Sequence, residues 1–268
     1  MNRGKKVAQI KNSRASVRIG IDASENMRLL PRKNNESGTD YAYRTLEYNI
    51  LMLNIPPGAW IREKPIAERL NLSKTPVHQA VSLLRDHMLV DVKSRSATHV
   101  SRIDLNILRQ GFFLRSTVEP VIVSQVIPSM SSTAIAMLRE NLEGQQNLLS
   151  SNIDTFTFIR LDDEFHHIIY QAADKDLVWK AMRKVTAHFD RVRYMGLIYG
   201  YEQPSIHDHM ELYKMLIVGR DVPQGEINKF ILKHLSHYLA YFDKMIEDLP
   251  DYFVLNGLND NQSHVILD

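Results

Sequence analysis

Asp162 and His166 have the residue types and the spacing for metal chemistry, because they lie four positions apart in a segment of helical periodicity. Residues four apart share one face of a helix, so the carboxylate and the imidazole could bind one divalent cation. His209 opens a later helical segment and His234 lies in the last one, and both could add a ligand. The chain has no cysteine, so the ligands would be nitrogen and oxygen, which suits Zn, Ni, Fe or Mn. Spacing alone fits a surface pair of Asp162 and His166 more often than a ligand pair.

Catalytic groups show no comparable order. Serine, histidine and aspartate are abundant, but no nucleophile, base and acid occur in a recognisable arrangement, and there is no glycine-rich phosphate loop. His166 and His167 could act as bases, but the sequence supplies no reaction for them. We therefore expect no enzyme, and a metal-dependent enzyme built on the helical part is the alternative.

The net charge of +2 conceals an uneven distribution. Residues 1–38 carry nine basic and three acidic side chains, residues 39–101 carry eight and six, and residues 102–268 carry sixteen and twenty-two. A basic N-terminal part beside an acidic C-terminal part favours contact with a polyanion, although ordinary surface charge with a solvated tail is the alternative. No apolar run approaches the ~20 residues of a membrane span. We expect a soluble cytoplasmic protein without a membrane partner.

The elements that must position these residues fall into four segments. Residues 1–38 are predicted to be a flexible basic arm, 39–103 a DNA-binding domain, 104–250 a helical domain and 251–268 a C-terminal tail. Order is expected to begin near Thr39 or Asp40, either of which can cap a helix. The helical domain is predicted to contain helices near 105–127, 132–150, 154–173, 176–198, 205–219 and 225–247. The predicted fold is mainly α.

A winged helix-turn-helix is predicted within residues 39–103. A short helix near Pro65 to Leu70 is followed by Ser73, a good N-cap, and by a second helix with an apolar face. Residues 89–92 and 99–101 read as two strands joined by a basic turn. The second helix can enter the major groove of DNA and the wing can touch the backbone. The candidate contacts are Ser73, Lys74, Thr75, His78, Arg95 and Ser96.

The run from Tyr43 to Val100 resembles the winged-helix domain of the GntR bacterial transcription regulators. Ile55-Pro56-Pro57-Gly58 and the stretch from Ile66 to Val77 follow the family pattern, which includes L-A-E-x-L-x-V-S-R-T-P-V. The resemblance implies DNA-contact positions at Lys64, Lys74, Thr75 and His78. Lys74 and His78 replace two arginines of the family, so the bidentate fork that reads guanine is lost and the operator sequence is expected to differ.

The remainder resembles the FCD domain, the helical effector domain of the FadR-like subfamily. Its hallmark D-x-x-F-H reads here from Asp162 to His166, and an acidic residue followed by histidine reads as Asp208-His209. The resemblance implies the metal ligands Asp162, His166, His209 and His234, with His237 as a rival for the last position. It also implies that Arg115 grips the carboxylate of an effector. An intrahelical pair of Arg115 with Glu119 is the alternative, and Arg191 and Arg193 are expected on a solvated face.

The sequence as a whole predicts a transcription regulator, a repressor rather than an activator, that binds operator DNA as a homodimer. Its helical domain is expected to bind a small organic acid, with or without a divalent metal, and thereby to change operator affinity. A DNA-binding protein that does not respond to ligands is the further alternative.

Overall fold

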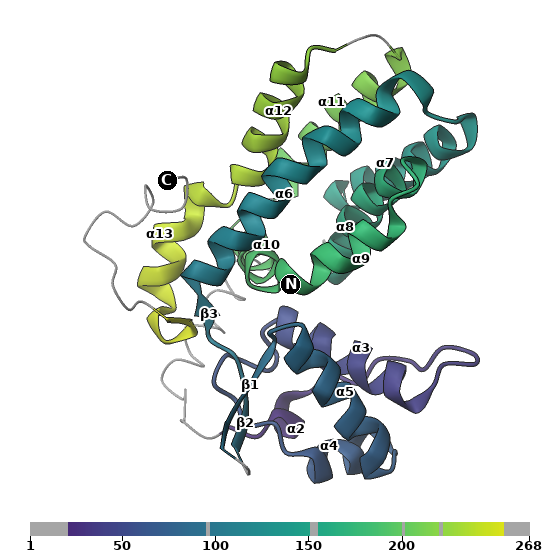
Figure 1. Cartoon of the computed structure of the whole chain (residues 1–268). Coiled ribbons are helices and arrows are strands. Elements are labelled where there is room, and N and C mark those ends of the chain that lie inside the picture. The colour runs from purple at the N-terminus through teal and green to yellow at the C-terminus, as the bar shows by residue number, and fades with distance from the viewer. Residues whose placement is uncertain (1–20, 95–96, 151–154, 200–201, 220–221, 255–268) are drawn as a thin grey trace.

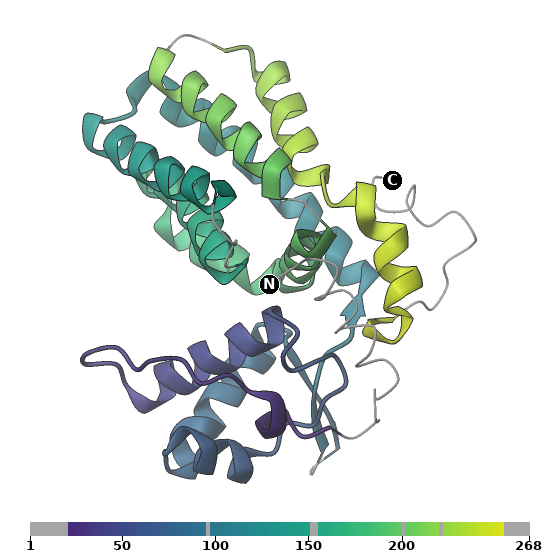
Figure 2. The ribbon, with the colours of Figure 1, turned by 180° about the vertical axis from the view of Figure 1, so that it is seen from behind.

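The computed structural model describes residues 21–94, 97–150, 155–199, 202–219 and 222–254, which form a head and a body (Figure 1). The head lies beneath the body when seen from both sides (Figures 1 and 2). Within the described residues, the regular structure of the body is helical apart from one short pair of strands. The mainly-α prediction, with a winged head before a helical bundle, is confirmed. None of the described helices is long and apolar enough to cross a membrane.

The head consists of α3 (Gly38–Leu51), α4 (Glu63–Leu70), α5 (Lys74–Asp86) and an antiparallel wing of β1 (Val90–Ser94) and β2 (Ala97–Val100). Asn71 ends α4 in a left-handed conformation, with φ of 53°, and turns the chain into α5. Ser73 occupies the N-cap position of α5, but its side chain makes no capping hydrogen bond, contrary to the sequence prediction. α3 begins two residues before Asp40, and the cap is Ser37 rather than Thr39 or Asp40.

Residues 21–37 pack against the head, so the prediction of a flexible arm is wrong for this stretch. Asp22 caps the N-terminus of α2 (Ala23–Asn26), and Ala23 and Met27 are buried in the core of the head. The side-chain amide of Asn49 bonds to both backbone groups of Arg28, with distances of 2.7 and 2.9 Å. Tertiary contacts of this kind leave no helical periodicity in the sequence. Residues 1–20 lie outside the described part of the chain.

The body contains α6 (Leu105–Val126), α7 (Ser132–Ser150), α8 (Thr155–Ala172), α9 (Asp176–Val185), α10 (Ala187–Tyr199), α11 (Glu202–Val218), α12 (Gln224–Ser236) and α13 (Leu239–Asp248). Two predicted helices, 176–198 and 225–247, are each divided in two. Thr186 separates α9 from α10, and its hydroxyl donates to Asp190 at 2.7 Å. Gly111 of α6 allows α10 to approach, because a Cβ there would lie 3.1 Å from the Cα of Thr186.

The chain beyond α13 is ordered as far as Val254, so the predicted tail begins later than expected. β4 (Phe253–Val254) pairs in parallel with β3 (Ile103–Asp104), which leads from the head into α6. Tyr252 and Phe253 are buried in the core of the body. This pairing holds the junction between head and body against the end of α13. Residues 255–268 lie outside the described part of the chain.

Candidate metal site and DNA-binding surface

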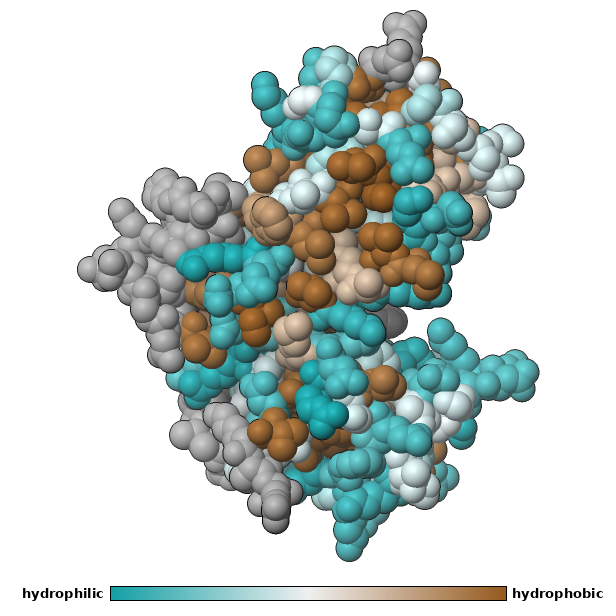
Figure 3. Space-filling view, in the orientation of Figure 1, coloured by the Kyte–Doolittle hydropathy of each residue, from teal (hydrophilic) through white to brown (hydrophobic). Residues whose placement is uncertain are grey.

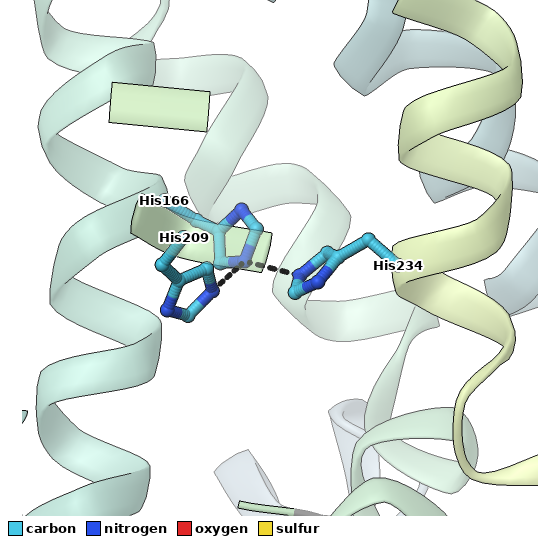
Figure 4. A group of neighbouring side chains, drawn as sticks. All are labelled: His166, His209 and His234. Atoms are coloured by element: carbon cyan, nitrogen blue, oxygen red, sulfur yellow. Dashed lines mark hydrogen bonds between the residues drawn. The ribbon is translucent and has the colours of Figure 1, made fainter. Parts of the chain in front are cut away.

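Three histidines from three helices point toward one another inside the body (Figure 4). His166 of α8 lies with its Nε2 atom 3.3 Å from the Nε2 atom of His209 on α11 and 3.3 Å from that of His234 on α12. Their exposed fractions are 3%, 0% and 1%. α8, α11 and α12 each bury an apolar face, so each histidine is fixed by the packing of its own helix.

The opposite nitrogen of each ring faces a hydrogen-bond acceptor. His209 donates its Nδ1 proton to Gln145 Oε1 at 2.8 Å. Nδ1 of His166 lies 3.5 Å from Glu119 Oε2, and Nδ1 of His234 lies 3.5 Å from Asp208 Oδ2. Acceptors behind the ring orient metal-binding histidines and leave the Nε2 lone pairs free for the ion. A single proton can be shared by only two of the three Nε2 atoms, whereas a metal cation can accept a lone pair from each of them. The donor set therefore fits a divalent metal.

Burial keeps the imidazoles of His166 and His209 neutral, which is the form that binds metal. The pKa of His209 is lowered to about 3, mainly by burial, with Asp162 opposing the shift and His234 and Arg193 adding to it. Burial also holds the pKa of His166 well below its usual value, and the charge of Arg115 adds to this. A cation would therefore not need to displace protons from these two rings near neutral pH.

Asp162, the predicted fourth ligand, lies at the edge of the histidine cluster. Its Oδ1 atom is 3.6 Å from Nε2 of His209 and accepts a hydrogen bond of 2.9 Å from Ser205. Its other oxygen accepts a hydrogen bond from the guanidinium of buried Arg193. Burial, the largest single influence, raises the pKa of Asp162, but the charges of Arg193, the nearby histidines and Arg115 together outweigh it and lower the pKa to about 2. The carboxylate is thus ionised and one oxygen faces the histidines.

His237 does not join the cluster. Its Nε2 atom lies 2.6 Å from Asp208 Oδ2, the same oxygen that lies 3.5 Å from Nδ1 of His234, so Asp208 stands between the two rings. Lys233 donates to the other oxygen of Asp208 at 3.1 Å. Asp208, His234 and His237 form a second group whose ligand atoms lie close together, but the carboxylate of Asp208 is already paired with the ammonium of Lys233. Geometry favours His234 over His237 as the third imidazole.

Arg115, the predicted effector contact, is buried in the same part of the body. It pairs with Glu119 on its own helix, as the simpler alternative predicts, but both side chains are inaccessible to solvent. Its guanidinium lies over the ring of Phe189 and its Nη1 atom is 3.9 Å from Asp190. The Nη2 atom is buried and has no hydrogen-bond partner among the described residues. One donor therefore remains for a ligand.

Arg191 and Arg193 are buried in α10, which corrects the prediction of a solvated face. Arg193 binds Asp162 and, at 3.0 Å, Asp190, and Asp190 also accepts from Arg183 at 2.8 Å. The sequence did contain a signal for this burial. The charged residues at 190, 191 and 193 point to different sides of α10, so the helix has no single polar face that could be turned to solvent. Arg193 and Tyr194 also line a narrow crevice with Asp162, Phe158, Ile159 and Leu197.

The other side of α10 binds the head. His188 donates from Nε2 to the carbonyl of Met88 at 3.0 Å and accepts from the backbone of Asp104 at 2.9 Å. Arg191 donates to the carbonyl of Ser101 at 2.8 Å and to its hydroxyl at 3.1 Å. Met88 and Ser101 lie just before β1 and just after β2, so both ends of the wing are tied to this helix. α10 thus contacts the candidate metal site on one side and the wing on the other.

The predicted DNA contacts that lie in the described part of the head are exposed to solvent. Lys64 of α4 and Ser73, Lys74, Thr75 and His78 at the start of α5 are all exposed. Because Ser73 does not cap the helix, its hydroxyl is available to a phosphate. Arg95 and Ser96, predicted at the tip of the wing, lie outside the described residues. Glu63, whose carboxylate contacts both Lys74 and His78, was not identified from the sequence.

Comparison with known proteins gives two family matches. The model for bacterial regulatory proteins of the gntR family matches residues 39–100, and the FCD domain model matches residues 110–222. The chain is similar to the HTH-type transcriptional repressor RspR of Escherichia coli K12, with 28% identity over 214 residues, 79% of this chain and 91% of the relative. The Nta operon transcriptional regulator of Aminobacter aminovorans is 24% identical over 192 residues, 71% of this chain and 86% of that one.

Two solved structures resemble this one in fold. Escherichia coli McbR/YncC gives a TM-score of 0.64 with 20% identity, over 78% of this chain and 99% of that structure. A GntR transcriptional regulator from Rhodococcus sp. RHA1 gives a TM-score of 0.62 with 19% identity, over 81% of this chain and all of the other. At this identity the likeness shows that the head-and-body architecture is shared.

Proposed function

The chain is a GntR-family transcription regulator with a C-terminal FCD domain, and from this premise we propose that a divalent metal and a small organic acid bind its body and change the operator affinity of its head. RspR is named a repressor, and we extend repression to this chain as part of the proposal. The relatives are regulators rather than enzymes. The cytoplasm, where operator DNA is accessible, is the proposed location.

The convergence of three buried Nε2 atoms is the observation that carries the metal proposal. His166, His209 and His234 would hold the ion, and Asp162 would add an oxygen ligand. Zn, Ni, Fe or Mn suits such a nitrogen-rich site. When bound, the metal supplies a positive centre that accepts a carboxylate oxygen.

The guanidinium of Arg115 supports a carboxylate effector. Its free buried donor lies in the region of His166 and Glu119, and Arg193 contributes a second guanidinium beside Asp162. A buried cationic group favours an anion, and an arginine can bind a carboxylate with two hydrogen bonds. An effector acid would therefore compete with Glu119 and Asp162 for these two arginines.

α10 supplies a physical route from this site to the DNA. Arg193 and Asp190 respond to any change at Asp162 and Arg115, because they bond to them directly. Arg191 and His188, on the same helix, hold Ser101 and Met88 beside the wing. A rigid helix moves as a unit, so a shift at one side is carried to the other. We propose that effector binding selects one position of the wing relative to the body.

The DNA proposal predicts a large effect of Lys74→Ala and of Thr75→Ala. A good base contact contributes about 1–3 kcal/mol, so each variant should weaken operator binding by about tenfold or more. The measurement is a fluorescence anisotropy titration with a duplex that the unaltered protein selects from random DNA. Arg85→Ala, at the exposed far end of α5, is the matched control and should bind normally. Equal binding by all three variants would remove α5 from the interface.

We propose a homodimer because hydrophobic side chains gather on the body along α6 (Figure 3). Phe113 and Val121 lie eight residues apart on one face of α6 and are 69% and 60% exposed. Leu177 on α9 is also highly exposed. Apolar patches of this kind mark protein interfaces, and a symmetric dimer would match two operator half-sites.

Phe113→Asp is expected to dissociate this dimer. Loss of a central aromatic contact costs about 2 kcal/mol or more, so the dimer dissociation constant should rise by about 30-fold. Sedimentation velocity over a concentration series measures this. Met137→Asp, at an exposed site on α7, is the control. A dimer of unchanged strength in Phe113→Asp would place the interface elsewhere.

A further inference from the structure

We propose that Glu63 positions His78 and Lys74 and thereby sets how well the head distinguishes its operator from other DNA, an inference that rests on the proposed role of α5 in DNA binding. Glu63 is the first residue of α4 and faces the start of α5. Its Oε1 atom lies 2.7 Å from Nδ1 of His78, and its Oε2 atom lies 3.6 Å from Nζ of Lys74.

The side chains of His78 and Lys74, the two partners of Glu63, are largely exposed to solvent. The side chains of His78 and Lys74 are 71% and 73% exposed, whereas that of Glu63 is only 22% exposed. Their four-residue spacing places them on one face of α5. The carboxylate is therefore the fixed member of the group, and the two exposed side chains take their orientation from it. Its place at the N-terminus of α4 also favours a negative charge.

The bond to Glu63 decides which atom His78 presents to DNA. A carboxylate oxygen only accepts, so Nδ1 of His78 carries the proton that it donates to Glu63. Nε2 is then the ring atom left for a base edge or a phosphate. Without Glu63 the ring could rotate and present either nitrogen, and a contact with one base would become a contact with many.

The negative charge of Glu63 also increases discrimination between the operator and other DNA. Affinity for DNA of any sequence comes mainly from cationic side chains near phosphates, and a carboxylate beside Lys74 opposes it. Operator binding can offset this cost through base contacts that other sequences do not provide. Glu63 should therefore lower binding to non-operator DNA more than binding to the operator.

The test compares two duplexes of equal length, one selected from random DNA by the unaltered protein and one with the same composition in scrambled order. Discrimination is the ratio of the two affinities. Glu63→Ala should strengthen binding to the scrambled duplex and weaken binding to the selected one, whereas Glu63→Gln removes the charge but keeps an oxygen that can accept from Nδ1 of His78, so it should mainly strengthen binding to the scrambled duplex. Because a specific contact is worth about 1–3 kcal/mol, we expect discrimination to fall by about tenfold. Thermal unfolding checks that each variant is folded.

Two controls separate positioning from simple charge removal. Glu68→Gln removes the same charge from an exposed site on α4 and should leave discrimination unchanged. In a His78→Ala background, Glu63→Ala should lose most of its effect on discrimination, because the residue acts through His78. The proposal is overturned if Glu63→Ala changes both affinities by one factor, or if its effect persists undiminished without His78. If Lys74→Ala binds the selected duplex normally, the proposed role of α5 has failed instead.

Discussion

His209→Ala is expected to abolish stoichiometric metal binding. Its Nε2 atom is one of three that converge, and Gln145 holds the ring in place from behind. Loss of a residue behind a metal ligand already costs about 10–100-fold in metal affinity, so the loss of an imidazole itself should exceed about 100-fold. Metal analysis of protein dialysed against one equivalent of Zn²⁺ measures occupancy. Isothermal titration of chelator-treated protein measures affinity.

The matched control for this prediction is His207→Ala. His207 lies two residues earlier on α11 but is exposed, so its removal should leave occupancy and affinity unchanged. Far-UV circular dichroism shows whether the buried substitution has left the helices intact. Folded His209→Ala protein that binds one Zn²⁺ as tightly as the unaltered chain would disprove the histidine site.

Arg191→Ala is expected to uncouple the body from the head. Arg191 is fully buried, and its bonds to Ser101 join α10 to the end of the wing. Coupling between two sites on a protein is typically about 5–150-fold, and we expect this variant to lose most of that factor while its metal affinity stays normal. Operator titrations with Zn²⁺ and with chelator measure the factor. The physical reason is that a shift of α10 no longer reaches Ser101.

Ser101→Ala provides a milder form of the same test. It removes the hydroxyl that accepts from Arg191 and donates to the carbonyl of Met88 at 2.7 Å, but it leaves the arginine in the core. We expect a partial loss of coupling. Arg160→Ala, at an exposed ion pair on α8, is the control and should respond as the unaltered protein does. Full coupling in folded Arg191→Ala protein would show that α10 is not the route.

The histidines of the candidate metal site could be named from the sequence because the resemblance to FCD domains gives a ligand role to a spacing that alone is more typical of a surface pair. Asp162 and His166 have the spacing of one helix face, and the resemblance to FCD domains places His209 and His234 on other helices. The residues around the cluster could not be found in this way. Gln145 comes from α7, whereas Asp190 and Arg193 come from α10, and the relative placement of these two helices depends on packing, which leaves no pattern in the chain.

The burial of the arginines on α10 was predicted wrongly from the sequence. Arg191 and Arg193 were expected at the surface because arginine is rarely buried, but partners on other segments compensate them. Ala23 and Met27 illustrate the converse case. They lie in a polar stretch that looks flexible, but the head buries both of them. Burial in both cases is decided by tertiary contacts rather than by local composition.

Operator affinity of the unaltered protein, measured with and without metal, tests the central claim most directly. Protein stripped with chelator and protein loaded with one equivalent of Zn²⁺ are each titrated with the selected duplex, alone and with a series of small carboxylic acids. The account predicts that at least one acid shifts the affinity of the metal-loaded protein by about fivefold or more, the lower range of allosteric coupling, and leaves the stripped protein unchanged. Affinities that agree within error under every condition would contradict it and would describe a DNA-binding protein that ignores ligands.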